Sequence, residues 1–436
     1  MSVTLPPANA NLRLLLRIQL PLVFTCLEEF VGRWIRMARV ARLIQFFSFL
    51  AVACLSTFLS TEVAFAQVTS QQTEGIDEAQ ALASPVAFVY VGSSPSTNTY
   101  QIDGYAVASN GELTPVPESP FAANALGGVA VSGQHLFATN TISIYSFAIE
   151  SDGALRKVAT VNARQYNGAA CGGPSPLFVS HAGTILYDVD NYGSQCANNT
   201  YQAFSIESTG ELNYLGMTSA ASPVFNTPLS FLGNNKYGYS SSCYHYSAGI
   251  YEFSRSATGT LTLSGNAAGT PTPGSGNFYC TFLTAADPTN HVAISVQQLS
   301  GSTWATVGSP QLATYTAGLS GHLTTKSIFS NMPHTAVQFV TDLKMSPSGK
   351  LLAVAGSAGL QVFHFNGSYP ITHYTARLTT DSIDQMFWDK ANHLYAISRS
   401  TNKLFVFTIT PYSVKQAPGS PYTITTPMNI AVLPKS

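Results

Sequence analysis

Seven short segments of the chain repeat one pattern, and this repetition constrains the fold more than any other feature. Each copy is a polar turn followed by an apolar strand rich in Tyr, Val, Leu and Ala. Repeats of about 40 to 60 residues built from short strands are typical of a β-propeller, in which each repeat forms one blade. The copies are VAFVYVGS from Val86, HLFATN from His135, ILYDVD from Ile185, KYGYSS from Lys236, HVAISV from His291, LLAVAG from Leu351 and HLYAIS from His393.

The sixth repeat shows the four strands expected of a blade, from innermost strand A to outermost strand D. They are predicted at Asp342–Ser346, Leu351–Ala355, Leu360–Phe365 and Ile371–Ala376. Strands A and B are nearly continuous apolar runs, as expected where both faces of a strand are covered by neighbouring blades. In five other repeats the outer hairpin carries a glycine, which allows the positive φ of a tight turn. These glycines are Gly111, Gly153, Gly210, Gly259 and Gly321.

The two ends of the chain complement each other. The first repeat begins at Val86 with a B-type strand and has no A strand before it, whereas the chain finishes with an A-type strand, Met428–Leu433, that no B strand follows. We therefore expect the C-terminal strand to become the inner strand of blade 1, which closes the ring and covers otherwise open strand edges. The sequence thus predicts an all-β, seven-bladed propeller with four-stranded antiparallel blades, as one domain over residues 85–436.

The N-terminal region has the features of an export signal over residues 37–66. Arg39 and Arg42 precede the apolar run Leu43–Leu59, and Ala64-Phe65-Ala66 forms a cleavage site before Gln67. We interpret residues 1–36 as an extension from a mis-set translation start, and residues 67–84 as a flexible leader. Two alternatives remain: the apolar run is an uncleaved anchor, although it is short for a span, or Cys54 is lipidated. We expect an exported protein, periplasmic or extracellular, with no stable membrane span after cleavage.

The charge of the chain argues against nucleic-acid binding. Charged residues make up 9% of the chain and hydrophobic ones 45%, a balance that suits buried strands. The residues after position 66 keep 14 of the 20 basic and 18 of the 21 acidic side chains, a net charge of about −4. Proteins that bind nucleic acids rely on Lys and Arg contacts to phosphates, and no basic patch is available for them here.

Four cysteines follow the predicted cleavage site, and an even number in an exported chain indicates two disulfides. Cys171 and Cys280 lie on connections from strand D to strand A, and Cys196 and Cys243 lie on connections from strand B to strand C. In an up-and-down blade these two kinds of connection emerge on the same face. We predict the pairs Cys171–Cys196 and Cys243–Cys280, because pairing Cys196 with Cys243 would leave Cys171 and Cys280 too far apart.

Several short motifs resemble those of the lactonase-type, 6-phosphogluconolactonase-like family of seven-bladed propellers. They are Phe88-Val89-Tyr90-Val91-Gly92, the turn SPSGKLL at Ser346–Leu352, and the outer-strand endings Glu118-Ser119-Pro120-Phe121 and Gly419-Ser420-Pro421-Tyr422. The resemblance covers about residues 85–435 and implies the same architecture. It gives no His, Arg and Glu set that transfers residue by residue, so it carries fold rather than chemistry.

Ligands of propellers usually meet the mouth of the central channel, where the A strands begin. Alignment of the repeats places Thr281, Asp342, Asp384 and Asn429 there, with the last three on adjacent blades as a polar, acidic arc. Neighbouring carboxylates are suited to Ca²⁺ or to acid–base work, whereas each Asp alone is suited to accepting backbone N–H bonds in its loop. No cofactor and no other metal site is predicted.

Histidines and tyrosines offer further candidates. His245 and His334 lie on loops that reach the channel mouth if they face inward, and otherwise they are surface residues. By contrast, His135, His291 and His393 occupy the same place in three different blades, so they cannot converge on one point and are interpreted as structural. The tyrosines crowded in blade 4 suit either sugar stacking or packing, with packing favoured by their alternation. They are Tyr237, Tyr239, Tyr244, Tyr246 and Tyr251.

These observations favour an exported binding or interaction module that acts at the channel-mouth face. The partner is a small molecule, a carbohydrate or a protein that the sequence does not identify, and we expect the protein to be a monomer. A lactone hydrolase is the first alternative, and a structural envelope protein is the second. The chain has no phosphate-binding glycine loop, no G-x-S-x-G motif and no dinucleotide fingerprint.

Overall fold

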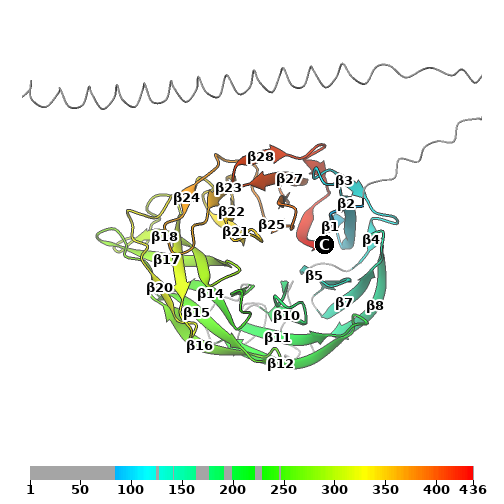
Figure 1. Ribbon diagram of the computed structural model, residues 1–436, viewed down its shortest axis with the longest axis horizontal. Helices are drawn as coiled ribbons and strands as arrows, with labels where there is room; N and C mark the ends of the chain where they lie inside the picture. Colours follow the sequence, from blue (N-terminus) through cyan, green and yellow to red (C-terminus); the bar gives the residue numbers. More distant parts are fainter. Residues whose placement is uncertain are drawn as a thin grey trace, which may run out of the picture. The chain divides into compact units, whose positions relative to one another are not determined.

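The structure is a computed structural model whose described residues form seven antiparallel sheets and no α-helix. The sheets are arranged around a centre as the blades of a propeller (Figure 1). The seven-bladed fold predicted from the repeats is confirmed. The residues that the structure describes are 84–123, 127–140, 142–163, 176–190, 199–220, 228–244 and 247–435.

Each blade contributes one strand to each of four concentric positions. The innermost strands, A, are β30 (Pro427–Pro434) in blade 1 and then β5 (Val129–Ser132), β9 (Leu177–Val179), β13 (Ser230–Phe231), β17 (Asn277–Ala286), β21 (Val340–Met345) and β25 (Gln385–Trp388). The B strands are β1 (Ala87–Ser96), β6 (His135–Thr139), β10 (Ile185–Asp190), β14 (Tyr237–Tyr244), β18 (His291–Ser300), β22 (Leu351–Gly356) and β26 (His393–Ser398).

The outer positions are filled in the same order. The C strands are β2 (Thr99–Val107), β7 (Ser143–Ile149), β11 (Asn199–Ile206), β15 (Ser247–Arg255), β19 (Gln311–Ala317), β23 (Gly359–His364) and β27 (Lys403–Thr410). The D strands are β3 (Leu113–Pro115), β8 (Leu155–Asn162), β12 (Leu212–Ala220), β16 (Leu261–Ala268), β20 (Leu323–Thr325), β24 (Thr372–His373) and β28 (Ser413–Gln416). Two short strands, β4 (Phe121–Ala122) and β29 (Tyr422–Thr423), extend blades 1 and 7 by pairing with β2 and β27.

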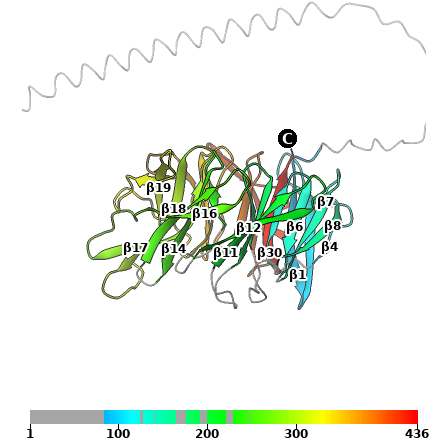
Figure 2. The same ribbon diagram turned by 90° about the horizontal axis from the view of Figure 1, so that it is seen from below.

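The last strand of the chain closes the ring. β30 pairs antiparallel with β1 from Ala87 opposite Pro434 to Gly92 opposite Asn429, and the two strands lie side by side in Figure 2. The pairing satisfies the backbone groups along the inner edge of β1, which would otherwise be an open edge. The predicted closure by the C-terminal strand is confirmed.

In blade 6 the strands form where the sequence predicts them, with two differences: β21 begins two residues before the predicted start at Asp342, and the outermost strand is shorter. β22 and β23 match the predicted B and C strands within one residue at each end, but β24 is only two residues long. Beyond β24 the pairing is irregular: the amide of Thr375 donates to the carbonyl of Val362 at 3.0 Å, but the amide of Val362 donates to the hydroxyl of Thr375 at 2.9 Å rather than to a backbone carbonyl. The B strands supply most of the core: β22 and β26 are buried along their whole length. Each fully buried Leu or Val contributes roughly 1.5–3 kcal/mol.

Neighbouring blades are joined by side chains that reach the outer turn of the next blade. Buried tyrosines of three B strands donate to the carbonyl oxygen of the turn glycine at 2.5–2.8 Å, in the pairs Tyr90–Gly153, Tyr187–Gly259 and Tyr239–Gly321. All five turn glycines predicted from the sequence have positive φ, between 86° and 101°. Only glycine adopts this φ without strain. In this turn conformation the glycine carbonyl lies within hydrogen-bond distance of the tyrosine hydroxyl.

The compact unit that contains the propeller begins at Ala81. The predicted extension (1–36), signal peptide (37–66) and most of the leader (67–84) lie outside the described residues. None of the residues that the structure describes belongs to a helix long and apolar enough to cross a membrane.

Candidate functional site

A cavity of about 600 Å³ lies where the innermost strands converge. Its walls come from the A strands of blades 1 and 3–7 and from residues that flank the strands, so it occupies the central channel. The lining is divided by character: blades 3 and 4 contribute Phe178, Leu229 and Phe231, whereas blades 6 and 7 contribute charged side chains. A concave site with apolar walls and a few convergent polar groups is the usual form of a small-molecule site.

The apolar side of the channel is rigidly packed. The ring of Phe178 stacks on Tyr187 with centroids 4.9 Å apart, and Phe231 lies 6.2 Å from Phe178. Tyr187 is buried behind the lining, and its hydroxyl donates to Gly259. Burial raises the pKa of Tyr187 to about 12, an effect that Arg255 partly opposes, so this tyrosine remains neutral at physiological pH.

Four charged residues line the opposite side: Asp342 and Lys344 from β21, and Asp384 and Arg399 from blade 7. Lys344 Nζ lies 3.4 Å from Asp342 Oδ1. The wall therefore carries two carboxylates and two cations, which balance one another. Of these four residues, the sequence predicted only Asp342 and Asp384. Lys344 and Arg399 were missed because their position at the channel depends on how the blades are arranged around the axis.

The carboxylate of Asp342 is occupied by the backbone. Its Oδ1 accepts the amide of Leu343 and its Oδ2 accepts the amide of Met386 in the next blade, both at 2.8 Å. These bonds join the inner strands of blades 6 and 7. Both carboxylate oxygens therefore already have partners, and few acceptor sites remain for a ligand. Of the two alternatives considered for Asp342, the structure supports the one in which its carboxylate accepts backbone N–H bonds.

Asp384 and Arg399 form the part of the wall that is open to a ligand. Asp384 Oδ2 accepts the backbone amide of Arg399 at 2.7 Å, and its Oδ1 accepts no hydrogen bond from the residues that the structure describes. Within the described part of the chain the guanidinium of Arg399 makes one weak bond, from Nη2 to the carbonyl of Met428 at 3.4 Å. Both residues line the cavity, so an acceptor and guanidinium donors without partners among the described residues are exposed on the same wall of the channel.

Asn429 does not line the cavity, although Met428 beside it does. It is 3% exposed and neither side-chain polar atom has a hydrogen-bond partner in the described structure. It lies opposite Gly92, where an added Cβ would approach Asn429 Oδ1 to 2.2 Å. The expected arc of three residues therefore reduces to Asp342 and Asp384. A better third member is Gln385, which lines the cavity and whose Oε1 accepts the amide of Ile430 at 2.8 Å.

The expectation that Thr281 opens onto the channel is wrong. Its side chain is fully buried, and its hydroxyl lies 3.0 Å from the carbonyl oxygens of both Ser242 and Gly249 in blade 4. The reason is a bulge in β17 between Thr281 and Thr284, which shifts the register so that Leu283 and Thr284 face the cavity instead. A bulge adds an unpaired residue without a clear sequence signal.

The loop histidines do not contribute to this cavity. His334 is exposed beyond the channel wall, and its Nδ1 lies 3.3 Å from the carbonyl of Ser309. His245 lies outside the described residues. The described residues contain no group of three or more His, Cys, Asp or Glu side chains placed to hold a metal ion.

Two of the B-strand histidines are tied to the turn between strands A and B of their own blade, which agrees with the structural role predicted for them. His393 Nδ1 lies 2.7 Å from Asp389 Oδ2, which also accepts the hydroxyl of Tyr395 at 2.8 Å. His291 pairs in the same way with Asp287 at 2.9 Å. Tyr237, Tyr239 and Tyr251 of blade 4 pack in the core, as the alternation of the strand indicates. Tyr246 and the side chain of Tyr244 lie outside the described part of the structure.

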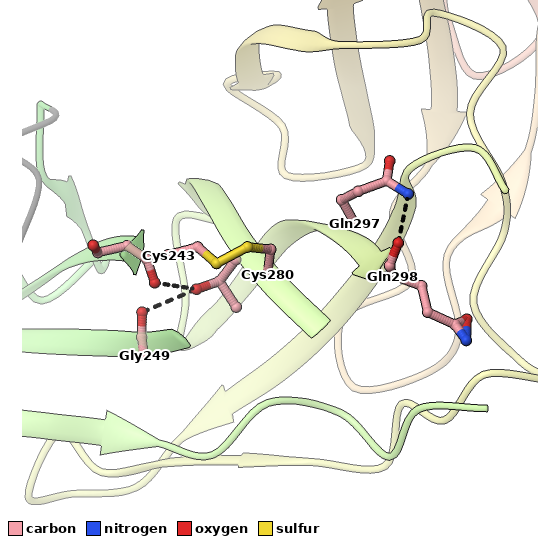
Figure 3. The surroundings of a disulfide bond; sticks show 7 residues. Cys243, Gly249, Cys280, Gln297 and Gln298 are labelled. Atoms are coloured by element: carbon pink, nitrogen blue, oxygen red, sulfur yellow. Dashed lines mark hydrogen bonds between the residues drawn. A yellow bond between two sulfur atoms is a disulfide. The ribbon is translucent and has the colours of Figure 1, made fainter. Parts of the chain in front are cut away.

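One of the two predicted disulfides is present. Cys243 at the end of β14 is bonded to Cys280 in β17, with Cα atoms 5.1 Å apart (Figure 3). The bond links the hairpin of blade 4 to the inner strand of blade 5 and lies next to the hydrogen bonds of Thr281. Cys171 and Cys196 lie outside the described residues, so their pairing stays a prediction.

The sequence matches no protein-family model and no curated protein. Solved structures similar to this one include a candidate 6-phosphogluconolactonase of Bacteroides uniformis and the periplasmic gluconolactonase of Pseudomonas aeruginosa. Each is 14% identical with a TM-score of 0.54, over 80% of this chain and 99% of the other. A Lactobacillus plantarum protein gives a TM-score of 0.56 at the same identity and coverage.

At identities this low, similarity to solved structures shows the fold alone. This fold agrees with the motifs found in the sequence. The shared outer-strand endings form equivalent turns in blades 1 and 7, where Ser119 Oγ accepts the amide of Gly104 and Ser420 Oγ accepts that of Val406, both at 2.9 Å. Both serines precede a cis proline. The chain is a divergent seven-bladed β-propeller with the fold of the 6-phosphogluconolactonase-like proteins.

Proposed function

We propose that this protein is an exported binding protein that holds a small hydroxylated molecule, such as a sugar or sugar lactone, in its central channel. The observation that carries the proposal is the pair Asp384 and Arg399 at the wall of the 600 Å³ cavity. A hydroxyl group both donates and accepts, so the hydroxyls of one ligand complement a carboxylate oxygen and guanidinium donors that line the same wall and have no partner among the described residues. The apolar wall around Phe178 suits the C–H face of a sugar ring.

Two observations support export. The Cys243–Cys280 disulfide is of a kind that persists in oxidising compartments, and a protein of the same fold is a periplasmic gluconolactonase. The N-terminal signal predicted from the sequence agrees with this assignment.

The proposal is tested by calorimetric titration of the purified protein with sugars, aldonic acids and aldonolactones. For any ligand found, Arg399→Ala should weaken binding roughly 10- to 100-fold, because hydrogen bonds to charged groups contribute about 1.5–3 kcal/mol each. Arg377→Ala is the matched control, since Arg377 is exposed, also donates to a backbone carbonyl, and does not line the cavity. Equal losses in both variants, or no ligand in the panel, would contradict the proposal.

Hydrolysis of a sugar lactone is the second candidate. The observation in its favour is the unpaired Oδ1 of Asp384, which could take a proton from water while Arg399 stabilises the developing oxyanion. The same lactones, followed by acid release at constant pH, distinguish the two functions. A binding protein leaves the rate of spontaneous hydrolysis unchanged. A hydrolase accelerates it, and Asp384→Asn then removes the acceleration while ligand binding is retained.

A further inference from the structure

A second cavity, of about 330 Å³, lies between blades 5 and 6 and shares no lining residue with the channel. Its walls include Phe282 and Leu299 of blade 5, Pro310 at the end of the β18–β19 loop, and Phe339 with Val340 of blade 6. The lining is mainly apolar. An apolar cavity of about 150 Å³ in another protein is large enough for benzene, so this one has room for a larger ring system.

Phe339 is exposed although its backbone is firmly held. Its side chain is 66% exposed, and its ring lies 6.1 Å from Phe282 in an edge-on arrangement. The carbonyl of Phe339 accepts the amide of Ser357 at 2.9 Å, and the carbonyl of Val337 accepts that of Ala358 at 3.0 Å. A preformed aromatic wall loses little entropy when a ligand binds, so this exposed ring is well placed for binding.

The cavity contains one fixed and unused hydrogen-bond acceptor. Gln297 is 7% exposed, and its Nε2 lies 3.0–3.3 Å from the carbonyl oxygens of Gln298, Val307 and Gly308. Because all three neighbours are acceptors, the orientation of the amide is determined. Figure 3 shows the amide nitrogen turned toward Gln298 and the oxygen turned away from it. Gln297 Oε1 accepts no hydrogen bond from the part of the chain that the structure describes.

We propose that this cavity binds a small aromatic molecule that carries one hydrogen-bond donor, of the indole or phenol type, with its ring against Phe282 and Phe339 and its donor on Gln297 Oε1. Unlike Gln298 Oε1, Gln297 Oε1 is not closed off from solvent, so a donor on the ligand can reach it and form one net hydrogen bond in place of water. The site is separate from the channel, so the proposal stands independently of the function proposed for Asp384 and Arg399.

The test compares two ligands that differ only in the donor. Binding of 5-fluoroindole and of 5-fluoro-1-methylindole to the purified protein is followed by the width of the ¹⁹F NMR signal. The N–H ligand should bind roughly 3- to 10-fold more tightly, the factor expected of one net hydrogen bond. Gln297→Met should abolish this preference, because it removes the acceptor.

A surface variant keeps the test valid if Gln297→Met disturbs the loop that its Nε2 holds. Phe339→Ala removes an exposed ring and should weaken both ligands at least tenfold, through lost ring contact and lost buried area. Phe329→Ala is the matched control, because Phe329 is 43% exposed and does not line the cavity. Equal affinity for the two indoles, no binding at millimolar concentration, or unchanged binding in Phe339→Ala would each overturn the proposal. Tighter binding of the peptide Gly-Trp-Gly than of indole would overturn the small-molecule occupant.

Discussion

The buried tyrosines of the B strands are the clearest case of single residues that determine how blades fit together. Tyr90, Tyr187 and Tyr239 occupy the same position in three blades, and each donates to a turn glycine of the following blade. The tyrosine supplies both a large apolar surface and one directed hydrogen bond. The repeated strands and the glycine turns were recognisable in the sequence, but their contact was not, since it joins residues 63 to 82 positions apart.

Tyr90→Phe should therefore destabilise the propeller by about 1–2 kcal/mol, because it keeps the ring but leaves the buried Gly153 carbonyl without this donor. Urea denaturation of both proteins measures the difference in unfolding free energy. The matched control is Tyr412→Phe: Tyr412 is 94% exposed, and a surface change of this kind stays within about 0.5 kcal/mol. An unchanged stability in Tyr90→Phe would mean that the hydrogen bond contributes nothing.

Glu252 gives a prediction of pH dependence. Burial raises its pKa above the ordinary value, an effect that Ser264 and His322 partly oppose. The folded state then binds the proton more tightly than the unfolded state. Between the ordinary pKa and the raised one, this group makes the protein more stable as the pH falls and less stable as it rises. Above the raised pKa the full cost of burying the charge remains.

Glu252→Gln should remove this contribution. The variant should be more stable than the wild type at neutral pH, and the difference should shrink as the pH falls toward the ordinary pKa of a glutamic acid. Thermal melts of both proteins across the range from pH 4 to pH 8 measure it. A difference that stays constant over this range would contradict the assigned cause.

Among the elements, strands were easier to predict than their register. B strands such as β22 and β26 are continuous runs buried on both faces, so their positions follow from the local sequence alone. The register of an A strand decides which of its residues meet the channel, so a single bulge in β17 was enough to place Thr281 in the wall rather than in the cavity. The Cys243–Cys280 bond was predicted correctly, although both cysteines lie within strands, at the end of β14 and in β17, rather than on the connections expected.

The C-terminal strand is the element on which the fold depends most. Deleting Met428–Ser436 removes most of β30, which exposes the inner edge of β1 and opens one side of the channel. We expect the shortened protein to aggregate or to remain insoluble. Size-exclusion chromatography checks this, with a control that lacks only Pro434–Ser436 and keeps most of the pairing with β1. A soluble monomer with an unchanged melting temperature would contradict closure of the ring by this strand.

At the scale of the whole molecule, the ring places the polar ends of several inner strands around one cavity. The sequence located two of its acidic residues, Asp342 and Asp384, from the alignment of repeats. It missed Arg399, which follows a B strand and reaches the channel only because the blades converge there. It also indicated that Asp342 is available to a ligand, whereas the carboxylate accepts backbone amides and joins two blades. Aligning the repeats shows which residues occupy equivalent positions in the blades. The site also uses residues such as Arg399 that this alignment did not identify.

The claim that the central channel is the binding site is tested most directly by a crystal structure of the protein soaked with its best ligand from the sugar and lactone panel. We predict ligand density in the channel, with hydroxyl groups within hydrogen-bond distance of both Asp384 Oδ1 and the Arg399 guanidinium. A ligand found only outside the channel, on the rim of the ring or between blades 5 and 6, would contradict the claim.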